Sequence, residues 1–228
     1  MTFISMTSAL QVWKLSLVFS LILLLCTVAL RAQSQDYPQS RVGLRAGPNL
    51  NSWTNEFPYL EFEGQRVFPD AWEATTGFHM GMYFNVRLGE IFAIEPGIMY
   101  TRKGTGTTLD LGSSIMVKGT VVSNYIDLPL LLRLYVAEGF NLYAGPQFSY
   151  HFGSTYSLTV NDEFVIQDED TSNGVSELDT SLVLGVGYEF AGGFNMNLGG
   201  EFGFLTVDSF DELSTFNRTI RLSLGYTF

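Results

Sequence analysis

Apolar and polar residues alternate strictly along much of this chain. At its end, large apolar residues occupy every second position, and polar or small residues stand between them: Ile220, Leu222, Leu224, Tyr226 and Phe228. A period of two predicts a β-strand with one apolar and one polar face. The pattern recurs in segments long enough for tilted membrane-spanning strands: 42–50, 76–88, 91–102, 120–136, 140–152, 179–190, 194–204 and 218–228.

The connections between these segments alternate in length. Glycine-bearing turns at 89–90, 137–139 and 191–193 alternate with longer stretches at 51–75, 103–119, 153–178 and 205–217. Short turns on one rim and long loops on the other are typical of outer-membrane barrels, and an even strand number brings both chain ends to one side. We therefore predict an all-β fold, an eight-stranded antiparallel transmembrane β-barrel with up-and-down topology, periplasmic termini and extracellular long loops. A soluble β-sandwich is the alternative, although it does not require this alternation.

The first 32 residues have a different character. The stretch from Leu15 to Leu30 carries no charge, follows Lys14, and leads to the small residue Ala32. This layout is typical of a cleaved signal peptide, and a retained anchor is the alternative. Cys26 follows a leucine, whereas a lipoprotein signal has a small residue there, so we expect no lipid anchor. The predicted organisation is a signal peptide at 1–32, a short lead at 33–41 and the barrel at 42–228.

The distribution of charged residues indicates what fills the interior of the predicted barrel. The residues assigned to the lipid face carry no charge, and a mid-membrane Arg or Lys there would cost about 2–4 kcal/mol. Strand parity instead places eight charged residues inside: Arg45, Arg87, Glu95, Asp127, Arg133, Glu189, Glu201 and Arg221. Eight strands leave room for little more than side chains, and buried ions need partners. We predict a lumen filled by a structural charge network, and a polar path or ligand site is the alternative.

Proline and overall charge add two expectations. Pro48, Pro96, Pro129 and Pro146 fall inside predicted strands, where each removes a ladder donor, so we expect bulges or strand ends there. Without the basic residues of the predicted signal peptide, Lys14 and Arg31, 10 of the 12 basic residues remain against 23 acidic ones. Nucleic acid is therefore not an expected partner. The expected surroundings are outer-membrane lipid and lipopolysaccharide.

Several strands resemble those of the outer-membrane β-barrel domain family often called PorT-like. Residues 125–133 (YIDLPLLLR) are similar to that family's Tyr-Leu-Glu-Ile-Pro-Leu-Leu-Leu-Lys pattern, and further matches lie at 42–50 (VGLRAGPNL), 77–81 (GFHMG), 94–100 (IEPGIMY) and 142–147 (LYAGPQ). The resemblance implies the eight-stranded outer-membrane barrel and identifies function poorly. Its name-giving member is linked to protein secretion across the outer membrane. Tyr226 and Phe228 resemble the C-terminal sorting signal that the barrel-assembly machinery reads.

Two groups of residues invite a chemical reading. Ser149 and His151 share a strand face, but nucleophilic catalysis also needs mutual reach and a third group that orients the base, and none is identifiable. The segment 153–178 contains six acidic residues and no Lys or Arg, which is compatible with calcium, yet it lacks the EF-hand spacing. We expect an acidic, solvated loop and a protein that is not an enzyme, with no catalytic residue, cofactor or metal.

Aromatic residues in the long loops leave the partner open: Trp53, Phe57, Tyr59, Phe62, Phe68, Trp72, Phe210 and Phe216. They can anchor a protein partner, or they can pack on one another and at the membrane interface. We predict a monomeric, non-enzymatic barrel with a structural or loop-mediated binding role. The alternatives are a narrow porin-like channel for ions or small solutes and an accessory component of an outer-membrane protein-secretion system.

Overall fold

A computed structural model of the chain describes residues 40–54, 60–62, 65–67, 72–110, 116–161, 163–170, 176–204 and 216–228. Its elements are all strands: β1 (Arg41–Thr54), β2 (Leu60–Phe62), β3 (Gln65–Val67), β4 (Trp72–Arg87), β5 (Phe92–Asp110), β6 (Met116–Tyr135), β7 (Phe140–Val160), β8 (Glu163–Asp170), β9 (Leu178–Glu189), β10 (Phe194–Gly203) and β11 (Phe216–Thr227). Within these ranges, no helix has the length and apolar character needed to cross a membrane. The predicted signal peptide and most of the predicted lead lie outside the described residues.

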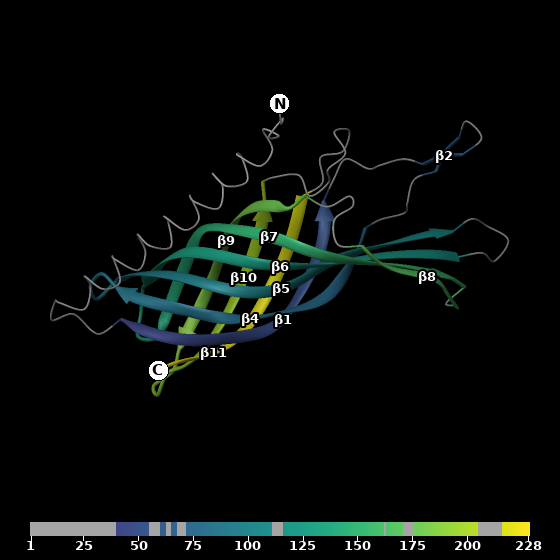
Figure 1. Ribbon diagram of the computed structural model, residues 1–228. Helices are drawn as coiled ribbons and strands as arrows, with labels where there is room; N and C mark the ends of the chain where they lie inside the picture. The colour runs from purple at the N-terminus through teal and green to yellow at the C-terminus, as the bar shows by residue number, and fades with distance from the viewer. Residues whose placement is uncertain are drawn as a thin grey trace, which may run out of the picture.

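Eight of these strands close into a barrel. Each pairs antiparallel with its neighbours in the order β1, β4, β5, β6, β7, β9, β10, β11, and β11 returns to β1. The closing seam runs from Gly43 opposite Thr227 to Thr54 opposite Phe216. The predicted fold, an eight-stranded antiparallel up-and-down barrel, is confirmed. We call the rim with the tight turns at 88–91, 136–139 and 190–193 the turn end and the opposite rim the loop end (Figure 1).

Three neighbouring strands are much longer than the alternation of apolar residues indicated. β5, β6 and β7 contain 19, 20 and 21 residues, whereas β9, β10 and β11 contain 12, 10 and 12. Together with β8, which pairs with β7, they extend past the loop end as a projecting sheet (Figure 1). The prediction of loops at 103–119 and 153–178 is therefore wrong over 103–110, 116–119, 153–160 and 163–170. Beyond the membrane both faces can be polar, so the ladder continues after the apolar alternation stops.

The prediction of bulges or strand ends at the prolines is also wrong. None of the register shifts, at 74–78, 124–125 and 158–159, falls at a proline. Pro48 pairs with Phe78 of β4, and the pairing of β1 with β11 skips 47–48 while the register on either side is unchanged. Pro129 likewise pairs with Gln147, and the ladder to β5 skips 128–129. Each missing donor thus interrupts the ladder to one neighbour, and the strand continues without a bulge.

The barrel is polar inside and apolar outside. Residues buried in the lumen include Glu95, Lys103, Asp127 and Glu201, each 2% exposed or less. Leu198, Leu224 and other large apolar side chains face outward and are exposed. In a bilayer, that outward band is covered by lipid, and the closed ring of paired strands satisfies the backbone without water. The hydrophobic contribution to stability therefore comes from the bilayer, and the interior is held by polar contacts.

Candidate functional site

Four charged side chains meet in the middle of the lumen: Lys103 of β5, Asp127 of β6, Glu201 of β10 and Arg221 of β11. Lys103 Nζ lies 2.5 Å from Glu201 Oε1 and 3.5 Å from Asp127 Oδ1. Arg221 Nη2 donates to Asp127 Oδ2 at 2.7 Å and also to Glu201 Oε2. We call this set the central quartet. Its two cations and two carboxylates balance, which is the condition for tolerating ions in a deeply buried site.

Neutral side chains complete the shell of the central quartet. Thr101 Oγ1 donates to Asp127 Oδ2 at 2.7 Å, and Ser181 Oγ donates to Glu201 Oε1 at 3.3 Å. Arg221 Nη1 donates to the Oε1 of Gln147 at 2.9 Å. The strands that supply the quartet and this shell are β5, β6, β7, β9, β10 and β11, so the network ties most of the wall together across the lumen.

A second cluster lies nearer the turn end. Glu95 of β5 accepts from Arg45 Nη1 at 2.9 Å and from Arg133 Nε and Nη2 at 2.6 and 2.8 Å. Bidentate pairing of this kind is among the strongest side-chain contacts. The guanidinium carbons of Arg45 and Arg133 also lie 4.2 and 4.7 Å from the ring centroids of Tyr83 and Tyr143. The aromatic faces add a favourable cation–π contact where two cations share one carboxylate.

A third cluster, more exposed to solvent than the other two, lies at the turn end of the lumen. Glu189 accepts from Arg41 at 3.0 Å and from Arg87 at 3.5 Å, and the side chains of Glu189 and Arg87 are each 20% exposed. Arg87 also stacks over the Tyr135 ring, with 3.4 Å between the guanidinium carbon and the ring centroid. Because these groups are partly wetted, each ion pair here contributes less than one in the central quartet.

Hydroxyl, imidazole and amide groups fill the loop end of the lumen. His151 Nε2 lies 2.8 Å from Ser154 Oγ, which in turn lies 2.8 Å from Ser123 Oγ. Asn217 Nδ2 donates to Asp179 Oδ2 at 2.7 Å. Tyr125, which is 1% exposed, packs against the His151 ring. The lumen is therefore occupied by side chains from one end to the other.

The structure places all eight predicted lumen charges on the inner face and brings them into three clusters. Sequence reasoning missed further charges that point inward in the described part of the chain, among them Arg41, Lys103 and Asp179. Lys103 was assigned to a loop because the apolar alternation ends at residue 102. The alternation of the strand could have identified it: Glu95, Met99 and Thr101 of the same strand all point inward, and Lys103 occupies the next inward position.

The two residues with catalytic possibilities have separate partners. Ser149 Oγ accepts from Gln147 Nε2 at 3.3 Å and from Lys103 Nζ at 3.5 Å, so it belongs to the shell of the central quartet. His151 instead contacts Ser154. Both residues are buried, at 1% and 3% exposure, and no hydrogen bond joins them. Among the described residues, no group of three or more His, Cys, Asp or Glu is arranged to hold a metal ion.

Other predicted features are only partly described. Asp168, Glu169 and Asp170 of the acidic segment 153–178 lie in β8 and so belong to a strand rather than to the expected loop; Asp162 lies outside the described residues. Of the loop aromatics, Trp53 packs against Tyr125 in the lumen. Phe57, Tyr59, Phe68 and Phe210 lie outside the described residues, and only the backbone of Phe62 and Trp72 is described. Phe216 begins β11 and is partly buried.

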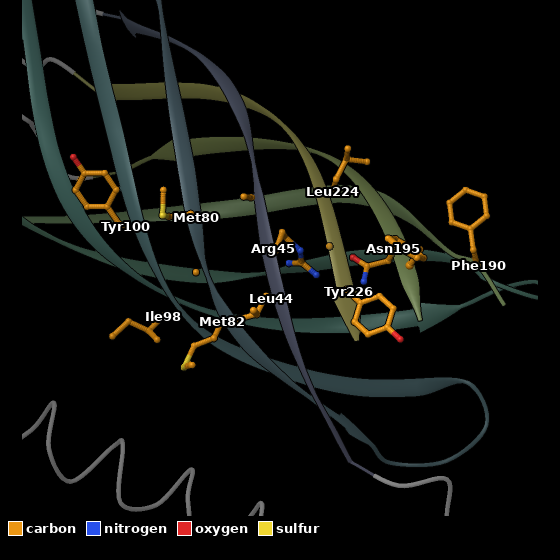
Figure 2. Close-up of a pocket in the computed structure, with 14 residues that line it drawn as sticks. Leu44, Arg45, Met80, Met82, Ile98, Tyr100, Phe190, Asn195, Leu224 and Tyr226 are labelled. Carbon is orange, nitrogen blue, oxygen red and sulfur yellow. The ribbon is translucent and has the colours of Figure 1, made fainter. Parts of the chain in front are cut away.

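Two hollows accompany the barrel. A cavity of about 30 Å³ lies in the lumen between the two buried charge clusters, lined by Arg45, His79, Tyr143, Arg221 and Ser223 among others. It has room for roughly one water molecule. A shallow depression of about 810 Å³ lies on the outer wall, lined by side chains such as Leu44, Met80, Met82 and Ile98 (Figure 2). Its lining is almost wholly apolar, so it forms part of the surface that lipid covers.

The C-terminal residues lie on the outer wall at the turn end. Tyr226 packs edge-on against Phe194 and Phe228, with ring centroids 5.1 Å apart in both pairs. Aromatic side chains at such a level form the interfacial girdle of membrane barrels. Recognition of Tyr226 and Phe228 by the barrel-assembly machinery stays a prediction.

A closed ring of eight strands with an apolar outer band and a polar filled interior defines a transmembrane β-barrel. Residues 32–209 match the model of the family described as Outer membrane protein beta-barrel domain. The chain belongs to this family, as its strand motifs indicated, and is an outer-membrane β-barrel protein.

Comparison with solved structures finds other small outer-membrane proteins. Ail, the attachment invasion locus protein of Yersinia pestis, was crystallised with the heparin analogue sucrose octasulfate; it is 13% identical, with a TM-score of 0.46, over 84% of this chain and 100% of that one. OprG from Pseudomonas aeruginosa is 12% identical, with a TM-score of 0.45, over 84% of this chain and 97% of that one. None of the curated proteins matches the chain significantly.

Proposed function

We propose that this protein is a non-enzymatic outer-membrane barrel with a sealed lumen, and that it acts through the projecting sheet at its loop end. The observation that carries the proposal is the central quartet. Lys103, Asp127 and Glu201 are each 1% exposed or less, and Arg221 is 8% exposed. Ions this well paired and this deeply buried form a plug, because an open channel would hydrate them.

The projecting sheet supports a binding role. A barrel needs only about 9–11 residues per strand to cross the membrane, and β5, β6 and β7 have nearly twice that number. The extra residues of these strands therefore form ordered structure outside the lipid. β8 pairs with β7 on one side, and no other described strand covers its second edge. A free strand edge can receive an extended segment of a protein partner.

The proposed orientation follows from the same geometry. β1 begins and β11 ends at the turn end, so the start and end of the barrel domain would face the periplasm and the projecting sheet would face outward from the cell. The barrel has no open strand edge among its eight wall strands, which favours a monomer over a pairing of barrels.

An accessory role in secretion would use the periplasmic rim, and copurification of a periplasmic partner would favour it.

Conductance measurements test the sealed lumen. Purified protein inserted into a planar lipid bilayer is expected to give no stepwise current at either polarity, since the quartet and the Arg45–Glu95–Arg133 cluster block the path in series. A large-bore porin inserted under the same conditions provides the positive control. Regular current steps from this protein, with a size that depends on the salt concentration, would favour the porin-like alternative and end the sealed-barrel proposal.

A non-enzymatic role predicts that the polar residues near the loop end affect only stability. Replacing His151 by Asn, or Ser154 by Ala, is expected to leave the lipid composition of the outer membrane unchanged, because His151 contacts Ser154 but no carboxylate among the described residues is hydrogen-bonded to the imidazole. Mass spectrometry of extracted lipid A and phospholipids from cells that carry either variant measures this. Loss of a deacylated or modified lipid species in both variants would indicate a hydrolase.

A further inference from the structure

Two arginines face outward at the loop-end edge of the apolar band, Arg102 of β5 and Arg218 of β11. Each stands two residues from an apolar outward residue, Tyr100 and Ile220 respectively. Register places Arg102 beside Phe78 of β4 and Asn124 of β6, and it places Arg218 beside Phe202 of β10. The chain as a whole has 12 basic and 23 acidic residues, so basic side chains at this level are not a general property of its surface.

The surroundings of Arg102 differ from those of Arg218. The Arg102 side chain is exposed and makes no hydrogen bond or ion pair within the described part of the chain. Arg218 is partly buried, and its guanidinium carbon lies 5.3 Å from the ring centroid of Phe202. Of the two cations, Arg102 is therefore the more accessible to a ligand.

A row of three aromatic rings adjoins Arg102 on the outer wall, and it includes its cross-strand partner Phe78. Phe78 and Tyr100 have ring centroids 5.5 Å apart, and Tyr100 and Phe152 have centroids 6.1 Å apart. Tyr100 projects outward from the wall (Figure 2), and its hydroxyl donates to the Asn124 amide oxygen at 2.7 Å. The row thus presents an apolar surface toward the membrane, with a guanidinium and polar groups at its upper edge.

On the orientation proposed above, we propose that Arg102 and this aromatic row bind a phosphate-bearing lipid of the outer leaflet. The planar guanidinium offers paired donors that match phosphate oxygens, and the three rings lie where the acyl chain of the same lipid would run. An unpaired cation at the interface of a bilayer gains most from an anionic head group held at its own depth. The lipid would act as a lateral anchor beside the base of the projecting sheet.

Native mass spectrometry of the full protein in detergent tests this site with diphosphorylated lipid A as the probe. The comparison uses the unmodified protein, Arg102→Gln and Arg218→Gln, each first checked for the heat-dependent gel mobility of a folded barrel. Arg102→Gln is expected to weaken lipid A binding about tenfold, equivalent to about 1.4 kcal/mol. Arg218→Gln, which removes the cation that is already stacked on Phe202, is expected to change binding by less than about threefold.

Two further titrations distinguish a lipid phosphate from free inorganic phosphate as the ligand. Lipid A from which both phosphates have been removed is expected to bind as weakly to the unmodified protein as lipid A binds to Arg102→Gln. Inorganic phosphate at millimolar concentration is expected not to displace lipid A. Equal binding by Arg102→Gln and the unmodified protein, equal losses in the two arginine variants, or displacement by free phosphate would each overturn the proposal.

Discussion

Replacing Glu201 by Gln is expected to lower the free energy of unfolding by about 3–5 kcal/mol, because it leaves a buried cation without its counter-charge. Glu201 accepts from both Lys103 and Arg221, and all three are shielded from water. A neutral amide keeps the size of the side chain, so the loss reports charge and not packing. Urea unfolding of the protein in detergent micelles, followed by tryptophan fluorescence and by gel mobility, measures the change.

Two companion variants show whether charge balance is the cause. Lys103→Met together with Glu201→Gln leaves the quartet with one cation and one carboxylate, and we expect it to recover at least half of the loss. Glu189→Gln removes a carboxylate that also faces two arginines but is 20% exposed, and it is expected to cost about 1 kcal/mol or less. A double variant no more stable than Glu201→Gln alone would show that the quartet is not held by its charge balance.

Replacing Gly185 by Val is expected to cost about 3 kcal/mol by overpacking the lumen. Gly185 of β9 lies opposite Tyr143 of β7 and Gly199 of β10, and the Tyr143 ring lies across both glycines. A Cβ at Gly185 would overlap that ring and the carbonyl oxygen of Leu198. Displacing Tyr143 would also remove the aromatic face beneath Arg133. The same urea unfolding measurement applies.

Gly119 provides the matched control. It lies in β6 on the projecting sheet, where a Cβ would meet only the Thr107 methyl carbon, at an ordinary contact distance of 3.5 Å. Gly119→Val is expected to change the unfolding free energy by less than about 1 kcal/mol, since β-branched residues suit strands. If Gly185→Val is as well tolerated as Gly119→Val, the ring of Tyr143 is not confined as the structure indicates.

The sequence predicted the barrel well because the bilayer imposes a strict rule on outward residues. Within the membrane the outward residues of the wall strands are almost all apolar and alternate with inward ones, so both the strands and the inward set can be read by parity. That reading placed Arg45, Asp127 and Glu201 in the lumen. It failed where the rule stops applying: β5 to β7 continue past the lipid with residues such as Thr105, Thr107 and Ser157, which carry no apolar alternation.

The arrangement inside the lumen could be predicted only in part. Equal counts of inward cations and carboxylates indicated pairing, but parity says nothing about which charges meet across the barrel. Lys103 and Glu201 are 98 residues apart and come from strands that do not pair, and their contact depends on the stagger of all the strands between them. The surroundings of the outward Arg102 could not be predicted from the sequence either, since the aromatic row beside it includes Phe78 and Phe152 of other strands.

The sealed lumen is tested most directly by the reactivity of a single thiol placed inside it. Cys26 is the chain's one cysteine, so Cys26→Ser combined with Ser149→Cys leaves one thiol beside the central quartet. In the folded barrel this thiol is expected to resist a small charged thiol reagent and to react only after unfolding, whereas a thiol at the exposed turn residue Ala137 reacts in both states. Rapid labelling of Ser149→Cys in the folded barrel would mean that water and ions reach the middle of the lumen, and it would contradict the sealed barrel.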